Sequence, residues 1–125
     1  PGAEGVMGKL LIHSSHGKED PERATLPFIV GNNAAIAGQD VRILLTIEGV
    51  WLATEGGADG VHQEGLPPLA EIMKEYVANG GQVWACQSCT KPRGIDEDRL
   101  VEGARIAAAM QAVEFLSQGA ASLTF

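Results

Sequence analysis

The two cysteines of the chain lie three residues apart, as Cys86-Gln87-Ser88-Cys89, and no other cysteine occurs in its 125 residues. Thiols at this spacing suit dithiol redox exchange, half of a zinc site, or a nucleophilic thiol with an assisting neighbour. The pair comes directly after the apolar run 82–85, which is typical of a buried strand. We expect that strand to present Cys86 at its carboxyl end, where open α/β sheets form their ligand crevices. Cys86 is therefore the first candidate for a reactive, half-exposed thiol.

The residues just after the pair bear on which of these chemistries applies. Pro92 and Gly94 come too soon for a long helix to continue from Cys89, so we expect the pair in a loop. This argues against a thioredoxin-type oxidoreductase, in which a long helix lowers the pKa of the first thiol. Lys91 and Arg93 place positive charge beside the thiols and favour a thiolate. Together with Gly94 they are the residues expected to stabilise a bound anion.

Three polar residues are expected to line the same crevice. His13 and His16 lie at the end of the first predicted strand, and Glu48 lies at the end of the second. A structural zinc site needs four ligands, which the histidines and cysteines would supply only if the first and third strands were adjacent. The familiar zinc-binding spacings are absent. We therefore expect no metal, and no cofactor.

Short apolar runs alternate with helical patterns along the chain, which predicts an α/β fold with a mainly parallel sheet between helices. Asp20-Pro21 is typical of a helix start, and this helix is expected to reach about Gly38, with a kink at Pro27 or a later start. The clearest helix begins after Pro67-Pro68. Strands are expected at 8–14, 40–46 and 82–85, with a closing strand through Leu123 and Phe125.

Shorter elements are expected between these. Segment 48–54 is predicted as a helical turn, and Asp96 is expected to cap another short helix. The stretch 106–116 is apolar on most sides and is expected to be largely covered by other parts of the molecule.

Composition and charge limit the class of protein. A net charge of −7 and an isoelectric point near 4.8 argue against a nucleic-acid partner. No apolar run approaches the length needed to span a bilayer, and the first residues do not resemble a signal peptide, so we expect no membrane partner and a cytoplasmic protein. Residues 1–7 are expected to be a cloning remnant ending in the initiator Met7, and residues 8–125 a single domain.

Three segments resemble the DsrE/DsrF-like family. Segment 86–95 is similar to its pattern Cys-x-x-Cys-x-x-x-Arg-Gly-Ile, segment 100–106 to the family's next segment, and segment 122–125 to its typical C-terminal end. The resemblance implies a three-layer α/β/α fold with a five-stranded, mostly parallel sheet, assembled as homo-trimers or homo-hexamers. It also implies a role in sulfur relay, in which Cys86 carries sulfur as a persulfide between donor and acceptor proteins. Members do not all share the cysteine that matches Cys89.

Three functions remain open at this point. The first is a sulfur carrier or sulfurtransferase, in which Cys86 holds the sulfur and Cys89 releases it by forming a disulfide. The second is a non-catalytic oligomeric binding module, whose binding would survive replacement of Cys86 by serine. The third is a dithiol redox or peroxiredoxin-like protein, which predicts ready Cys86–Cys89 disulfide formation and peroxide consumption.

Overall fold

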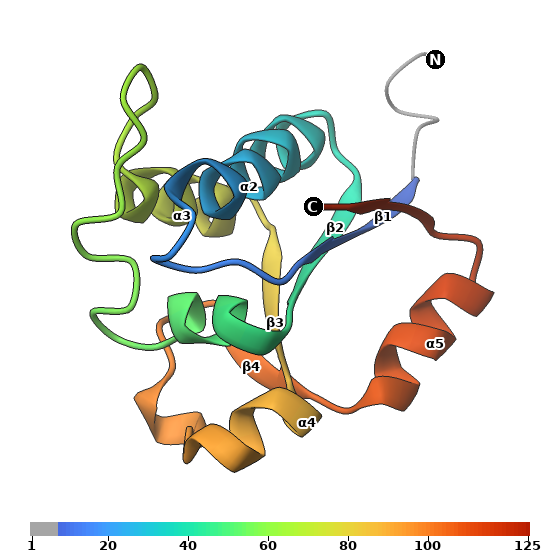
Figure 1. Cartoon of the computed structure of the whole chain (residues 1–125). Coiled ribbons are helices and arrows are strands. Elements are labelled where there is room, and N and C mark those ends of the chain that lie inside the picture. Colours follow the sequence, from blue (N-terminus) through green and yellow to red (C-terminus); the bar gives the residue numbers. More distant parts are fainter. Residues whose placement is uncertain (1–7) are drawn as a thin grey trace.

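The centre of the molecule is a sheet of five strands, all paired in parallel, in the order β4-β3-β2-β1-β5 (Figure 1). The computed structural model describes residues 8–125, so the expectation of a cloning remnant at 1–7 lies outside the described residues. The prediction of an α/β fold with a five-stranded, mostly parallel sheet is confirmed. The strands are β1 (Lys9–Ser14), β2 (Asp40–Leu45), β3 (Gln82–Cys86), β4 (Ala104–Ala107) and β5 (Ala121–Thr124).

Helices cover both faces of the sheet and so make three layers. Helices α2 (Pro21–Ile36) and α3 (Leu69–Ala78) lie side by side on one face, and α5 (Ala109–Ser117) lies on the other (Figure 1). Because successive strand residues point to opposite faces, Ile12 packs into the cluster beneath α2 and α3, while its neighbour Leu11 joins the cluster beneath α5.

Helix α2 begins where the sequence predicts. The Asp20 carboxylate accepts a hydrogen bond from the backbone N–H of Arg23 at 3.1 Å, and Pro21 occupies the first helical position. The helix continues through Pro27, although an interior proline removes one backbone hydrogen bond. Pro27 is buried, and the next residue, Phe28, is fully buried. We attribute the continuity of the helix to this packing against the sheet.

Helix α3 presents the apolar face that its sequence pattern predicts, with four buried residues: Leu69, Ile72, Met73 and Tyr76. The Tyr76 ring meets the Phe28 ring of α2 edge-to-face, with centroids 5.6 Å apart. The Tyr76 hydroxyl donates to the carbonyl of Gln82 at 2.6 Å, which ties the helix to the start of β3. This helix therefore fixes the strand that delivers the cysteines.

The C-terminal part differs from the expectation that 106–116 is one covered stretch. Ile106 and Ala107 belong to β4, and the helix begins only at Ala109. On α5, Phe115 is buried, while Met110, Val113 and Leu116 are 60%, 51% and 42% exposed. The expectation was wrong because α5 packs on the sheet through one narrow side, and positions three residues apart place the other apolar side chains outward.

Helices long and apolar enough to cross a bilayer do not occur within residues 8–125.

Candidate functional site

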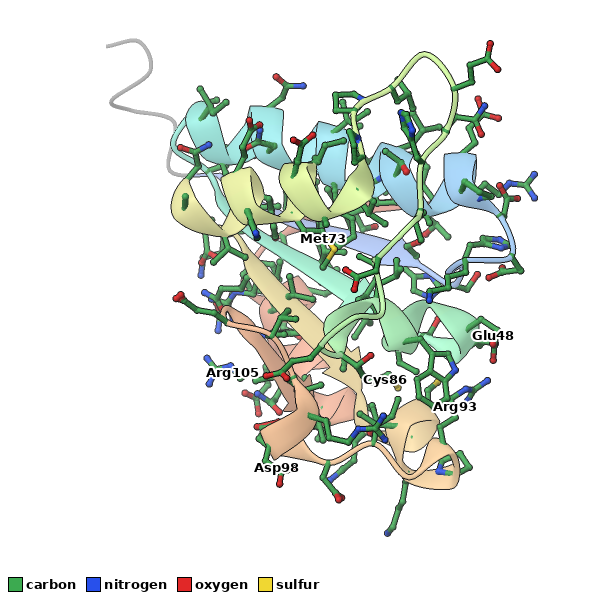
Figure 2. The ribbon with its side chains drawn as sticks, turned by 90° about the vertical axis from the view of Figure 1, so that its left-hand side faces the viewer. Glu48, Met73, Cys86, Arg93, Asp98 and Arg105 are labelled. Carbon is green, nitrogen blue, oxygen red and sulfur yellow. The ribbon has the colours of Figure 1, made fainter. Side chains whose placement is uncertain are left out.

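Cys86 is the last residue of β3, at the carboxyl edge of the parallel sheet, as the apolar run before it predicts (Figure 2). Its neighbours across the sheet are Ala107 of β4 and, by continuation of the Leu45–Ala85 pairing, Thr46 after β2. Cys86 and Cys89 are both free thiols of intermediate burial. Strand β3 is an inner strand, between β4 and β2. It therefore places the Cys86 thiol at the carboxyl end of the sheet, where the thiol stays partly exposed.

The segment after Cys86 is helical and not the loop that the sequence led us to expect. Helix α4 (Gln87–Thr90) makes a single turn that contains Cys89, and the 3-10 helix η2 (Lys91–Arg93) comes directly after it. Gly94 ends it with a φ of 66°, in the left-handed region that glycine adopts most easily. A long helix after the cysteines is absent from this segment, so that part of the prediction is confirmed.

The surroundings of Cys86 hold its thiol in the neutral form. Burial is the largest cause that raises its pKa, and the neighbouring Cys89 thiol adds to it. The backbone N–H groups of Cys89 and Ser88 act in the opposite direction, since they stabilise a thiolate, but the net shift is upward. Lys91 and Arg93 were expected to favour the thiolate, but the shift goes the other way.

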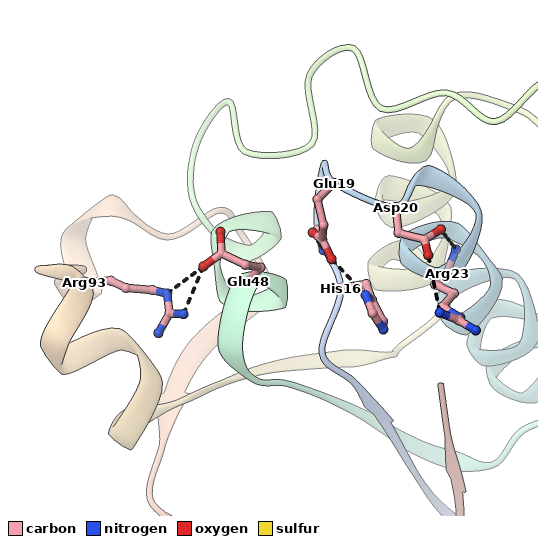
Figure 3. Close-up of polar contacts among 7 residues, drawn as sticks. His16, Glu19, Asp20, Arg23, Glu48 and Arg93 are labelled. Atoms are coloured by element: carbon pink, nitrogen blue, oxygen red, sulfur yellow. Dashed lines mark hydrogen bonds and ion pairs between the residues drawn. The ribbon is translucent and has the colours of Figure 1, made fainter.

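The charge of Arg93 is paired with Glu48 and is therefore not free to stabilise a thiolate. The Arg93 guanidinium donates to one Glu48 carboxylate oxygen from Nε at 3.2 Å and from Nη2 at 2.9 Å (Figure 3). Its Nη1 donates to the backbone carbonyl of Cys89 at 3.1 Å. Arg93 therefore joins the cysteine turn to the 3-10 helix η1 (Ile47–Ala53), which confirms the predicted helical turn there.

The other two residues expected to stabilise an anion are placed differently. The Gly94 N–H donates to the Lys91 carbonyl at 3.2 Å, so this N–H is already used within the turn. The Lys91 side chain is exposed. Lys91 is thus available to a molecule approaching from solvent, whereas Gly94 serves to end the turn.

His13 lies on β1 and reaches toward the cysteine strand through Thr46. Its Nε2 is 2.7 Å from the Thr46 Oγ1, and Thr46 lies just after β2 at the level of Cys86. Burial lowers the pKa of His13 and so favours the neutral ring. The sequence pattern did not identify Thr46, because a threonine at the end of a strand carries no functional signal on its own.

His16 lies apart from the thiols, in the loop after β1, where its Nδ1 is 2.8 Å from a Glu19 carboxylate oxygen (Figure 3). The zinc alternative required β1 and β3 to be adjacent, but β2 lies between them. Among residues 8–125, no group of three or more histidine, cysteine or acidic side chains is placed to hold a metal ion.

Two glycines set the position of Glu48. A Cβ on Gly17 would lie 2.6 Å from the Glu48 carbonyl oxygen, and one on Gly49 would lie 2.9 Å from the Ser14 carbonyl oxygen. Only glycine permits these backbones to approach so closely. The loop after β1, the end of β1 and η1 are therefore locked together beneath Glu48.

Ile47 is the most unusual backbone position near the site. It is the only non-glycine residue in 8–125 with a positive φ, at 52°, and its side chain is 54% exposed. This conformation is unfavourable for a β-branched residue, and such residues concentrate at functional sites. Ile47 separates Thr46, which contacts His13, from Glu48, which binds Arg93. No local sequence signal indicates this strain.

A cavity of about 460 Å³ opens beside Glu48, which lines it together with Glu19, Trp51 and Glu55. Of the three residues expected to line a crevice, Glu48 does so, whereas His13 and His16 are not among the residues lining this cavity. Cys86 does not line it either. The thiol and the cavity are separate parts of one sheet edge, connected by the Glu48–Arg93 pair.

Several uncharacterized archaeal proteins are similar to this chain. MK0008 of Methanopyrus kandleri is 29% identical over 113 residues, which cover 90% of this chain and 88% of that protein. MJ0989 of Methanocaldococcus jannaschii is 28% identical over 116 residues, covering 93% of this chain and 96% of that protein. MJ0760 of the same organism is 28% identical over 112 residues, and there the chain spans only 41% of the relative's length.

Solved structures share the fold. MTH1491 of Methanobacterium thermoautotrophicum, a protein of unknown function, superposes with a TM-score of 0.72 at 19% identity, over 94% of this chain and 99% of that one. The ychN protein of E. coli superposes with a TM-score of 0.68 at 20% identity, over 95% of this chain and all of that one. The sequence model of the DsrE/DsrF-like family matches residues 8–125. The chain belongs to the DsrE/DsrF-like family.

Proposed function

We propose that this protein is an intracellular sulfur carrier or sulfurtransferase that holds sulfane sulfur as a persulfide on Cys86. The observation that supports it most is the placement of Cys86, a free and half-buried thiol at the carboxyl end of β3. Membership of the DsrE/DsrF-like family suggests a sulfur-relay type of role. The sulfur donor and acceptor are proposed to be other cytoplasmic proteins.

Loading is an exchange between sulfur atoms. The Cys86 thiolate attacks the outer sulfur of a donor persulfide, the sulfur–sulfur bond of the donor breaks, and its electron pair leaves with the donor thiolate. Backbone N–H groups of Ser88 and Cys89 point toward Cys86 and stabilise negative charge on its sulfur. Delivery is the same step in reverse, with an acceptor thiolate attacking the outer sulfur and Cys86 leaving as thiolate.

Deprotonation of Cys86 must precede loading, and its raised pKa makes this the costly step. We therefore expect the loading rate to rise with pH through neutrality and to continue rising beyond the ordinary pKa of a thiol, about 8.5. A plateau already reached at pH 7 would contradict this. The measurement is the initial rate of loading as a function of pH in a Cys89→Ser variant, in which Cys86 is the only thiol.

Cys89 is proposed to release the sulfur when no acceptor is bound. Its thiolate attacks the inner sulfur of the Cys86 persulfide, hydrosulfide leaves, and a Cys86–Cys89 disulfide forms. The test uses protein loaded with radioactive sulfur and freed of donor. We expect label to leave the wild type as sulfide within the time for which Cys89→Ser retains it, and equal retention by both would exclude this role for Cys89.

Assembly into a homo-trimer or homo-hexamer is proposed through the outward side of α5. Met110, Val113 and Leu116 form an exposed apolar stripe, defined here as the α5 stripe. Exposed Leu123 lies on β5, the edge strand beyond β1. Light scattering coupled to size exclusion should give a mass of three or six chains, and a monomer of about 13 kDa would contradict assembly.

The α5 stripe also favours the second candidate, an oligomeric binding module without sulfur chemistry. The two functions differ in their dependence on Cys86. If Cys86→Ser assembles and retains its partners but takes up no sulfur, the carrier function holds. If the wild type also takes up none, the binding module is the better account. Consumption of peroxide with formation of the Cys86–Cys89 disulfide would instead indicate the dithiol alternative.

A further inference from the structure

A second cavity, of about 500 Å³, lies on the α3 side of the sheet. Leu52 and Met73 are buried in its lining, and Val77 and Val101 are half-buried. Figure 2 shows the Met73 side chain pointing from α3 into the space between this helix and the sheet. Both the volume and the mainly apolar lining are typical of sites for small molecules, which occupy roughly 300–1,000 Å³.

Backbone hydrogen bonds hold the wall of this cavity in place. The N–H of Val101 donates to the carbonyl of Ala53 at 2.8 Å, and the N–H of Glu55 donates to the carbonyl of Arg99 at 2.9 Å. These bonds join the segment before β4 to the end of η1, so the two walls opposite α3 form one unit. This wall of the cavity is therefore held in place by the fold, and the turn that contains Gly56, Ala58 and Asp59 completes the lining.

Three charged side chains lie at the mouth of the cavity: two carry a carboxylate and one carries an ammonium group. These residues are Asp59, Lys74 and Glu102, and all three are exposed. Within residues 8–125 none of the three takes part in an ion pair. The mouth has a net charge of −1 from these three groups, and the whole chain has −7. Such a field attracts a cation and opposes a carboxylate.

We propose that this cavity binds a small molecule with an apolar body and a primary ammonium group. The apolar body packs against Met73, Val77 and Val101, and the ammonium group stays at the mouth with Asp59 and Glu102. The site is independent of the thiols, because neither Cys86 nor Cys89 lines it. Assembly through the α5 stripe leaves it open, because α3 and α5 lie on opposite faces of the sheet (Figure 1).

Three probes with the same phenylethyl body and head groups of different charge test this assignment: 2-phenylethylamine, 2-phenylethanol and 3-phenylpropionate. Each is titrated into the isotope-labelled full chain while its backbone amide signals are followed by NMR. We expect saturable shifts at residues that line the cavity, among them Gly56, Ala58 and Val101, with the amine binding most tightly and the carboxylate least. Shifts elsewhere, no saturable binding of the amine, or equal binding of amine and carboxylate would overturn the proposal.

Variants separate the charge from the apolar contact. Asp59→Asn and Glu102→Gln should each weaken the amine about threefold, the scale of one exposed ion pair, and leave the alcohol unchanged. Ala78→Trp, at the exposed end of α3, should block all probes without loss of the fold, as judged by thermal unfolding. Glu71→Gln, also exposed on α3 but outside the cavity, is the control. Unchanged amine binding in Ala78→Trp would contradict the location.

Discussion

Beneath α2 and α3, nineteen of the described residues form one buried cluster on the sheet, whereas only four do so beneath α5. Each cluster contains an edge-to-face aromatic pair, Phe28–Tyr76 in the larger and Trp84–Phe115 in the smaller. The smaller one is shared with a charge, because the Arg42 guanidinium lies 4.0 Å from the Phe115 ring centre and 5.0 Å from that of Trp84. Asp40 pairs with Arg42 at 3.0 Å.

The two faces of the sheet therefore have different roles. The face beneath α2 and α3 supplies most of the apolar burial that stabilises the fold. The face beneath α5 is thinly covered, and α5 directs its remaining apolar side chains outward. Cys86 lies at the carboxyl edge of the sheet, between the two faces. The packing beneath α2 and α3 fixes its position, and in our proposal the outward side of α5 mediates assembly of the chains.

The largest effect is expected from the buried face. Phe28→Ala should lower the free energy of unfolding by about 3–5 kcal/mol, because it removes a ring with no exposed surface and leaves a cavity. Val113→Ala on α5 should change it by no more than about 0.5 kcal/mol in the isolated monomer. Urea unfolding at low protein concentration measures both values. Similar losses for the two variants would remove the distinction between the faces.

Next in size is the effect on assembly. Val113→Lys places a charge within the α5 stripe and should weaken association of the chains tenfold or more, about 1.4 kcal/mol, with the monomer fold intact. Glu114→Gln, exposed on the same helix, is the matched control. Mass by light scattering across a dilution series measures association. Assembly of Val113→Lys at wild-type concentrations would show that another surface is used.

A smaller effect is expected on the reactivity of Cys86, at the carboxyl edge of the sheet. Glu48→Gln releases the charge of Arg93, which stays beside Cys89 through its hydrogen bond to the Cys89 carbonyl. The pKa of Cys86 should then fall, and its alkylation at pH 7 should become about threefold faster. The measurement uses the Cys89→Ser background, with Glu55→Gln as control. An unchanged or slower rate would mean that the Glu48–Arg93 pair does not govern the thiol.

The smallest effect concerns His13. Burial lowers its pKa in the folded state, so the unfolded chain takes up a proton first as the pH falls. Its contribution to stability is therefore fully present above about pH 6.5 and is lost as the pH falls through the folded-state pKa. His13→Gln should flatten the slope of stability against pH between 6.5 and 5, and His62→Gln, exposed, should not. Equal slopes in wild type and His13→Gln would contradict this.

Sequence reasoning succeeded where local pattern decides the structure. The apolar run before Cys86 predicted both the strand and the half-buried thiol at its end, and Asp20-Pro21 predicted the start of α2. It failed at β4, because the four residues Ala104–Ala107 merge into the apolar pattern of the helix after them. Sequence reasoning also did not predict the pairing of Glu48 with Arg93. The two residues are 45 positions apart in the chain and come together only because the strands before them pair in the sheet.

The most direct test of the account is the location of bound sulfur. Wild type, Cys86→Ser and Cys89→Ser are incubated with a persulfide donor under anaerobic conditions, and their peptides are then examined by mass spectrometry. We expect one added sulfur atom on Cys86 in Cys89→Ser and none in Cys86→Ser. In the wild type we expect either the same added atom or the Cys86–Cys89 disulfide that remains after Cys89 has released it. Added sulfur on Cys89 in Cys86→Ser, or none on Cys86 in Cys89→Ser, would contradict the assignment of Cys86 as the sulfur-bearing residue.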